Sequence, residues 1–303
     1  MTRLRAWLEL TRGANLPTVW SNLLVGWLLA AAFGANLDAG ALPRLGLLLL
    51  GGSLLYTAGM FLNDAADAGW DRAHRPERPI PSGRLGPRAV RLSGFALLLL
   101  GLALWAWLSP LALGPAGLAL AALVLAYTRW HKVRPAPAPW LMGACRAALP
   151  LAGWLCNAPP AASPAGLALV LAHAVALLLY TVGISALARH EATGGEPGGL
   201  ARVAPPLAAL PVPLTLAFQG APPLLPLIWA CGLVVFIGWT RRRLRDVSER
   251  VGARIAGLCL VDYLAWVAVR HRFEPSDPLS MGGLMLLLFL GTTLALRRLM
   301  PST

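Results

Sequence analysis

Three aspartates, Asp64, Asp67 and Asp71, stand close together in a chain that carries only 13 acidic residues. Their spacing of three and then four residues places the carboxylates on one face of a helix. Carboxylates gathered in this way repel one another unless a cation lies between them, and such hard oxygen ligands suit Mg²⁺, which is often shared with substrate phosphates. The neighbouring Asn63 can add an amide oxygen or donate to phosphate. The segment predicts a Mg²⁺ site in which the three aspartates are both metal ligands and catalytic residues.

Arginines follow the aspartates directly. A guanidinium group binds phosphate with paired donors, so carboxylates followed by arginines indicate a metal site joined to a diphosphate clamp. We expect Arg72, Arg75 and Arg78 to bind the substrate. Arg88 and Arg91, further along, are expected only to set the membrane topology.

The elements that position these residues are predicted to be membrane helices. Of the 303 residues, 57% are hydrophobic and 13% are charged, about half the charged fraction of a soluble domain. Lipid offers no hydrogen-bond partners to a bare backbone, so the spans must be helical. We predict an all-α, polytopic membrane bundle that forms a single domain over 1–303, with nine core helices and a tenth at the carboxyl end. The expected spans are 17–35, 45–62, 90–108, 111–128, 140–157, 165–188, 203–219, 223–240, 252–270 and 279–297, and the inner connection after the second span is expected at 63–89.

The net charge of +13 could suggest a nucleic-acid partner, but the placement of the charges argues against one. With the amino terminus inside and the spans alternating, 22 of the 26 basic residues fall in cytoplasmic segments. Positive charge concentrated on the cytoplasmic side is the rule for membrane proteins. We therefore expect an integral protein of the inner or cell membrane, with the amino terminus and the active-site loops cytoplasmic. We expect the basic surface to contact the lipid bilayer, and we expect no nucleic-acid partner.

The run N-D-x-x-D-x-x-x-D, here NDAADAGWD, followed by RPERPIPSGR, resembles the first signature of the UbiA superfamily of intramembrane prenyltransferases. In that family the run follows the second helix and binds the diphosphate of a polyprenyl donor through Mg²⁺. The resemblance implies a UbiA-like fold and the transfer of a prenyl group from a polyprenyl diphosphate to a lipophilic or aromatic acceptor.

A second match to this family lies in AYTRWHKV, after the fourth expected span. The family often has a tyrosine there, followed closely by lysine or arginine, in contact with the diphosphate. The resemblance thus implies that Tyr127, Arg129 and Lys132 bind the substrate. Arg146 lies inside an expected span, where a charge normally has a partner; donor binding and a structural ion pair both remain open for it. Asn22, in the first span, is expected to line the substrate cavity.

The second signature of the family, an aspartate-rich run after the sixth helix, is altered. The corresponding stretch, YTVGISALARHEATGGEPGG, contains no aspartate. Either Glu191 holds a second Mg²⁺, or Arg189 and His190 supply positive charge in place of that metal. We expect both Arg189 and Glu191 to act in catalysis. The pattern HEATGG is similar to the divergent UbiA branch found in Ebo-type operons.

Three other functions remain as alternatives. A catalytically altered UbiA-like protein could bind a prenyl lipid as one component of a biosynthetic or export pathway. A CDP-alcohol phosphotransferase would need the run D-G-x-x-A-R, which this chain lacks. A transporter would gather its charges near the bilayer midplane, whereas the charges here are expected at the inner surface. His173 is expected to be a packed helix residue.

Overall fold

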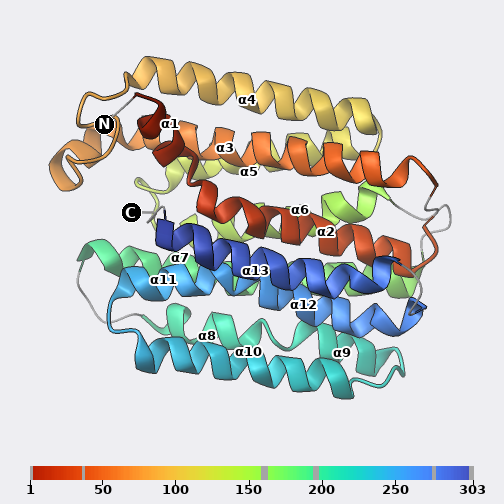
Figure 1. The fold of residues 1–303 in the computed structure, drawn as a ribbon. Helices are drawn as coiled ribbons and strands as arrows, with labels where there is room; N and C mark the ends of the chain where they lie inside the picture. Colours follow the sequence, from red (N-terminus) through yellow and green to blue (C-terminus); the bar gives the residue numbers. More distant parts are fainter. Residues whose placement is uncertain (1–2, 36–37, 158–162, 194–197, 275–277, 300–303) are drawn as a thin grey trace.

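The computed structural model describes residues 3–35, 38–157, 163–193, 198–274 and 278–299, and within these ranges every regular element is a helix. The long helices run side by side in one bundle (Figure 1). The prediction of an all-α bundle is confirmed. The α-helices are α1 (Arg3–Thr11), α2 (Leu16–Ala32), α3 (Ala41–His74), α4 (Pro87–Leu108), α5 (Leu113–Trp130), α6 (Ala138–Cys156), α7 (Pro164–Thr193), α8 (Gly199–Leu207), α9 (Pro211–Phe218), α10 (Leu224–Arg243), α11 (Val247–Ala256), α12 (Leu258–Val269) and α13 (Gly282–Leu299), and a 3₁₀ turn, η1 (Gly13–Asn15), joins α1 to α2.

Each of the ten expected spans corresponds to a helix or to a broken helix. Among the described residues, eight of these segments are long and apolar enough to cross a membrane. The other two are α2, which has 17 residues, and α6, which carries Arg146 within its length. α2 is buried along most of its length, so neighbouring helices rather than lipid surround it.

Two of the segments are broken where the sequence led us to expect continuous spans. The segment expected at 203–219 is divided into α8 and α9, and Pro205 and Pro206 lie inside α8, where each removes a backbone donor. The segment expected at 252–270 is divided into α11 and α12 at Gly257. A Cβ at Gly257 would lie 2.3 Å from the Tyr180 hydroxyl oxygen, so a larger residue at this break would displace the Tyr180 side chain.

The connection after α3 begins at residue 75 and not at residue 63, where the sequence led us to expect it. α3 continues to His74 and has 34 residues, which at 1.5 Å per residue is about 51 Å, well beyond the ~30 Å of bilayer hydrocarbon. The segment from Asn63 to His74 contains no proline, and α3 stops directly before Arg75, which precedes Pro76 and adopts φ −146° and ψ 62°. The aspartates therefore lie on the last turns of a rigid helix and not on a loop.

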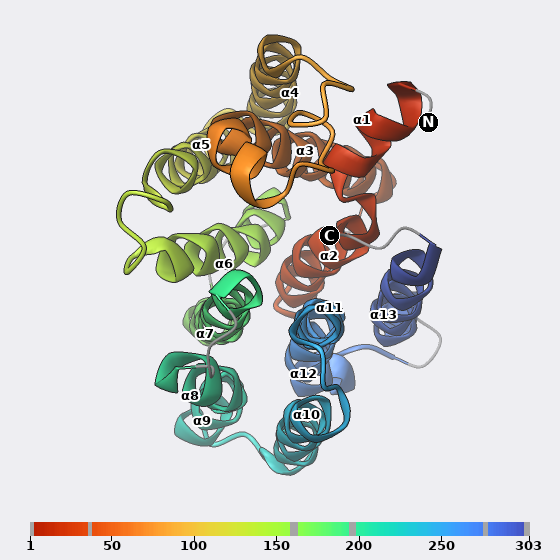
Figure 2. The same cartoon turned by 90° about the vertical axis from the view of Figure 1, so that its left-hand side faces the viewer.

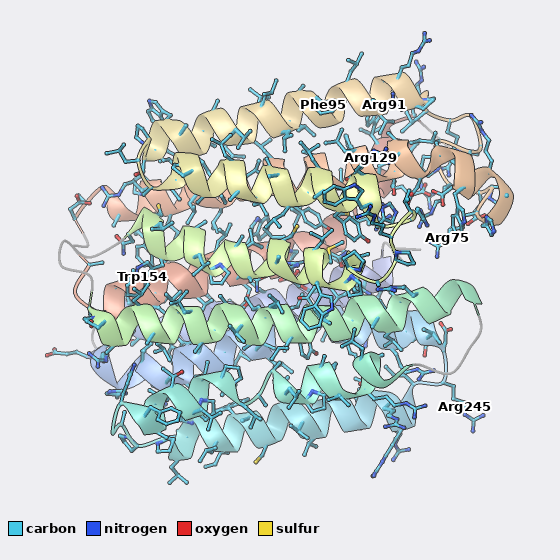
Figure 3. The ribbon with its side chains drawn as sticks, turned by 180° about the vertical axis from the view of Figure 1, so that it is seen from behind. Arg75, Arg91, Phe95, Arg129, Trp154 and Arg245 are labelled. Atoms are coloured by element: carbon cyan, nitrogen blue, oxygen red, sulfur yellow. The ribbon has the colours of Figure 1, made fainter. Side chains whose placement is uncertain are left out.

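The connections that carry most of the charge lie at one end of the bundle. Figure 3 shows Arg75, Arg129 and Arg245 at that end and Trp154 at the other. Figure 2 looks onto the charged end, where α1 lies beside the end of α3. The structure thus brings the basic residues of distant segments to one face, as the charge pattern of the sequence predicts.

α2 and α6 approach each other closely at two glycines. A Cβ at Gly26 would lie 2.0 Å from the Pro150 carbonyl oxygen, and a Cβ at Gly153 would lie 2.1 Å from the Leu23 carbonyl oxygen. Small residues allow membrane helices to pack backbone against backbone. This contact fixes Asn22 on α2 relative to Arg146 on α6.

Candidate active site

The three aspartates lie on one buried face of α3. Asp64 and Asp67 are each 6% exposed and Asp71 is 2% exposed, whereas Ala66 and Gly69 on the opposite face are exposed. Carboxylates are rarely buried to this extent unless they are paired. The shared face expected from their spacing is confirmed.

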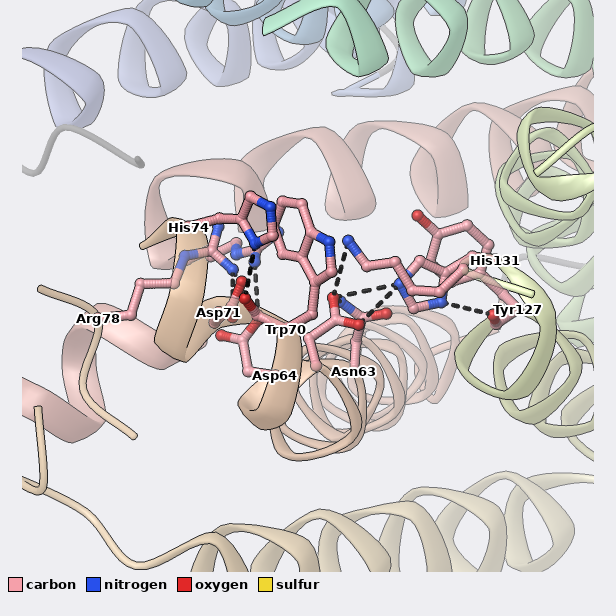
Figure 4. Close-up of polar contacts among 11 residues, drawn as sticks. Asn63, Asp64, Trp70, Asp71, His74, Arg78, Tyr127 and His131 are labelled. Atoms are coloured by element: carbon pink, nitrogen blue, oxygen red, sulfur yellow. Dashed lines mark hydrogen bonds and ion pairs between the residues drawn. The ribbon is translucent and has the colours of Figure 1, made fainter. Parts of the chain in front are cut away.

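Arg78 lies between two of these carboxylates (Figure 4). Its Nη1 is 3.0 Å from Asp71 Oδ2 and 3.7 Å from Asp64 Oδ1. The loop after α3 folds back to deliver this side chain, which is itself buried. In this arrangement Arg78 neutralises the aspartates directly.

Arg12, between α1 and η1, is a residue that the sequence analysis missed. Its Nη2 lies 2.9 Å from Asp64 Oδ1, and the carboxylate raises the pKa of Arg12 above its ordinary value. Among the described residues it is the one non-glycine with a positive φ, at φ 46° and ψ 45°. Such a conformation costs about 1–3 kcal/mol and persists only where surrounding contacts hold it. The Tyr56 hydroxyl supplies one such contact, since it lies 3.5 Å from the Arg12 carbonyl oxygen.

Asp67 is held by the second segment that the sequence singled out. His131 Nε2 lies 3.0 Å from Asp67 Oδ1, and Lys132 Nζ lies 3.9 Å from Asp67 Oδ2. Tyr127 stacks on His131 with ring centroids 4.9 Å apart, and Asn63 Nδ2 donates to Asp67 over 3.3 Å. The structure therefore brings Tyr127 and Lys132 to the aspartates, and it adds His131, which the sequence analysis passed over although it stands in the same run.

The Lys132 side chain has a second contact. Its Nζ lies 3.7 Å from the centroid of the Trp70 ring, and Trp70 in turn stacks on His74. A cation over an indole face is stabilised by the ring quadrupole. This contact holds the ammonium group beside Asp67 while leaving it partly exposed.

The other expected substrate-binding residues are not drawn into this cluster. Arg72 and Arg129 are exposed and Arg75 is half-buried, and none has a side-chain partner among the residues that the structure describes. Arg189 is exposed at the end of α7 and lies close enough to Tyr127 to interact with it electrostatically. The side chains of His190 and Glu191 lie outside those that the structure describes, so their roles remain predictions.

Arg146 belongs to a second polar cluster, deeper in the bundle. Its Nη1 donates to Asn22 Oδ1 over 3.1 Å, and Asn22 Nδ2 donates to Asp262 Oδ2 over 2.7 Å. The Ser21 hydroxyl also donates to Asp262, and His173 Nε2 lies 2.9 Å from Asp262 Oδ1. The direct ion pair considered for Arg146 is absent from the contacts of the described residues, because an amide stands between the two charges. His173 is buried, as expected, and is also hydrogen-bonded.

The aspartate cluster offers oxygen donors of the kind that bind Mg²⁺. No three His, Cys, Asp or Glu side chains of the described chain converge closely enough to hold a metal as they stand. However, Asn63 Oδ1 and Asp71 Oδ1 are buried and have no hydrogen-bond partner in the described part of the chain. Asn63 and Asp71 are eight residues apart, about 12 Å along α3, so the two oxygens lie at different ends of the cluster, one beside Asp67 and the other beside Arg78. Carboxylate and amide oxygens are the hard donors that Mg²⁺ prefers, so the residues fit the ion in the kind of donor that they offer.

Carboxylates buried at the end of a long membrane helix, beside several cations, mark a functional site in a membrane protein. The profile of the UbiA prenyltransferase family matches residues 19–250, and the chain belongs to this family. The enzymes of this family transfer a prenyl group from a polyprenyl diphosphate within the membrane.

This chain is similar in sequence or in structure to several known proteins, including the following three. Digeranylgeranylglyceryl phosphate synthase of Methanopyrus kandleri is 42% identical over 94 residues, which span 31% of this chain and 31% of that protein. A solved structure of a digeranylgeranylglyceryl phosphate synthase in membranes matches with a TM-score of 0.60 at 16% identity, over 97% of this chain and 100% of that one. A UbiA homolog from Archaeoglobus fulgidus, bound to DMAPP and Mg²⁺, matches with a TM-score of 0.48 at 17% identity, over 95% and 98% of the two chains. The structural likeness shows the fold alone, and the chain spans about a third of the length of the relative that it matches in sequence.

Proposed function

We propose that this protein transfers a prenyl group from a polyprenyl diphosphate to a lipophilic acceptor, with Mg²⁺ bound at the charged end of α3. The observation that carries this proposal is the buried face of Asp64, Asp67 and Asp71, which meets Arg12 and Arg78 within ion-pair distance. Carboxylates and guanidinium groups side by side can hold a metal diphosphate from both sides.

The roles follow from the contacts. Asp64, Asp67 and Asp71 would hold Mg²⁺, with Asn63 as an oxygen donor beside Asp67, and bound Mg²⁺ would neutralise charge on the departing diphosphate. Arg12 and Arg78 now neutralise Asp64, so both can turn to phosphate oxygens once a metal takes their place at the carboxylate. Lys132, partly exposed over Trp70, adds a further cation.

We propose that Arg189 and Glu191 complete the site from the second half of the chain. The electrostatic interaction of Arg189 with Tyr127 supports this placement. A single carboxylate makes a poor ligand set for Mg²⁺, so a positive side chain there would serve where the family uses a second metal. If Glu191 is a ligand, Glu191→Gln should raise the Mg²⁺ concentration that activity requires.

For the acceptor we propose a lipid alcohol that carries a phosphate group. The support is the sequence similarity to a digeranylgeranylglyceryl phosphate synthase over a third of the chain. A second candidate function, a prenyl-lipid binding protein of altered catalysis such as the Ebo-type branch, is favoured by the lack of aspartate between Tyr180 and Gly199. An aromatic acceptor is the remaining possibility that the family resemblance implies.

The test is a mass-spectrometric search for a prenylated product. Purified protein, Mg²⁺, geranylgeranyl diphosphate and a membrane extract should yield a new prenylated mass, which identifies the acceptor. Asp67→Asn should abolish Mg²⁺-dependent donor binding and product, whereas the control Asp38→Asn, an exposed residue at the opposite end paired with Arg44, should change neither. Donor binding by Asp67→Asn equal to that of the wild type would show that the site is assigned wrongly, and donor binding without any product would favour the binding protein.

A further inference from the structure

Arg146 is a cation inside the bundle that keeps part of its side chain exposed. It lies near the middle of α6, and its guanidinium donates to Asn22, which is fully buried on α2. The same guanidinium carbon lies 6.0 Å from the centroid of the Tyr56 ring on α3. These two contacts place the guanidinium against α2 and α3.

The hydrogen-bonding capacity of this guanidinium is largely unused. An arginine side chain has five N–H donors, and among the described residues Asn22 Oδ1 accepts one. Asp262 stands behind Asn22, and its oxygens contact Ser21, Asn22 and His173. Asp262 therefore holds the amide in place without contacting Arg146, and the remaining donors of Arg146 are available to a ligand.

The position of Arg146 relates it to the donor site. Tyr56 joins the two regions, because its hydroxyl reaches the Arg12 carbonyl oxygen and its ring faces Arg146. Tyr56 and Asp64 are eight residues apart on α3, which is about 12 Å along the helix. Arg146 thus lies deeper in the bundle than the proposed diphosphate site.

We infer that Arg146 is the receptor for a negatively charged group on the acceptor, held in position by Asn22 and Asp262. A charge at membrane depth is unfavourable unless it is used or paired, and a planar guanidinium suits the oxygens of a phosphate or a carboxylate. This inference rests on the proposed prenyl transfer and specifies its acceptor as an anion. The cluster of Asn22, Asp262, Ser21 and His173 comprises positioning residues, which act through Arg146.

The experiment measures acceptor binding without turnover. Wild-type protein in nanodiscs is titrated with two matched pairs, geranylgeranylglyceryl phosphate against geranylgeranylglycerol and 4-hydroxybenzoate against phenol. The wild type should bind the anionic member of one pair more tightly than the neutral member, and that pair identifies the anion as phosphate or carboxylate. Arg146→Gln should reduce this preference roughly ten-fold or more, Arg146→Lys should keep part of it, and the control Arg44→Gln, at the opposite end of the bundle, should keep all of it.

Binding of geranylgeranyl diphosphate with Mg²⁺ is measured on the same samples. Arg146→Gln should leave it unchanged, whereas failure of the wild type to bind this donor would count against the proposed function and not against the receptor. The inference is overturned if the wild type prefers neither anion or if Arg146→Gln keeps the preference. It is also overturned if this variant loses donor binding and has a lower melting temperature, because that result indicates a structural role. If Arg146→Gln does not fold, Arg146→Lys decides, because an unchanged preference in that variant contradicts a guanidinium receptor.

Discussion

The pair formed by Asp71 and Arg78 predicts that the three aspartates are not equivalent. Asp71 is the most deeply buried of them, and its ion pair of 3.0 Å closes the loop after α3 back onto the helix. Asp67, in contrast, has no buried arginine as a partner among the described residues, and it is contacted by Asn63, His131 and a partly exposed lysine. We therefore expect Asp71→Asn to reduce stability as well as donor binding, whereas Asp67→Asn should reduce donor binding alone.

The magnitude follows from what the substitution leaves behind. A hydrogen bond to a charged group contributes about 1.5–3 kcal/mol and a neutral one about 0.5–1.5 kcal/mol, so replacing the carboxylate by an amide costs about 1–2 kcal/mol. Asp64 remains 3.7 Å from Arg78 and still neutralises it. The loss of stability should therefore stay below the roughly 3–5 kcal/mol that is typical when a buried charge loses its partner. Asp71 Oδ1 is buried without a partner among the described residues. An amide nitrogen at this position in Asp71→Asn would be a buried donor without an acceptor, which adds a similar cost. For a chain of 303 residues, a total near 2 kcal/mol corresponds to a fall in melting temperature of about 3 °C.

A double-mutant cycle on the purified protein measures this pair. Melting temperatures of the wild type, Asp71→Asn, Arg78→Gln and the double variant are taken at one scan rate, without substrate or Mg²⁺. The double variant should be destabilised by less than the sum of the single variants, since residues in direct contact are coupled. Additive shifts, or an Asp71→Asn variant as stable as the wild type, would refute the view that this pair closes the site.

Further substitutions test other parts of the structure. Arg12→Gln should lower donor affinity roughly ten-fold at saturating Mg²⁺, as measured by calorimetric titration, and an unchanged affinity would limit Arg12 to a structural role. Gly153→Ala should lower the melting temperature, because its Cβ overlaps a backbone oxygen of α2, whereas the control Gly46→Ala, with open space around it, should not. A cysteine introduced at Ser82, in the loop after α3, should react with a membrane-impermeant reagent only after the cells are opened, and labelling in intact cells would reverse the proposed orientation. Arg189→Ala should weaken donor binding at saturating Mg²⁺, and unaltered binding and turnover would make the second half of the site vestigial.

Several features of this protein could be predicted from the sequence because they depend on spacing along the chain. The shared face of Asp64, Asp67 and Asp71 follows from helical periodicity, and the structure confirms it. The ten apolar runs reflect the requirement that lipid-exposed backbone be helical. Tyr127 and Lys132 were found because they match a family motif, and they lie at the aspartates as that motif implies.

The extent of α3 and the breaks in two spans were not predicted correctly. The connection was expected to begin where the apolar run ends, but no proline interrupts the helix before Pro76, and α3 continues to His74. The division between α11 and α12 lies at Gly257, where Tyr180, from a segment far away in the chain, packs against the glycine. Neither outcome is decided by local hydropathy.

The partners of the functional residues were decided by tertiary structure. Arg12 meets Asp64 across 52 positions of sequence, and Ser21 meets Asp262 across 241. Nothing in the local sequence marks Arg12 apart from other basic residues before the first span, or shows that Asn22 stands between Arg146 and Asp262. The sequence by itself determined which side chains could bind a metal diphosphate, because charge and helical spacing are local properties. The packing of α2, α3, α6 and α12 decided which cations neutralise the aspartates. It also decided that Arg146 keeps unused donors, because only that packing brings distant polar groups together away from water.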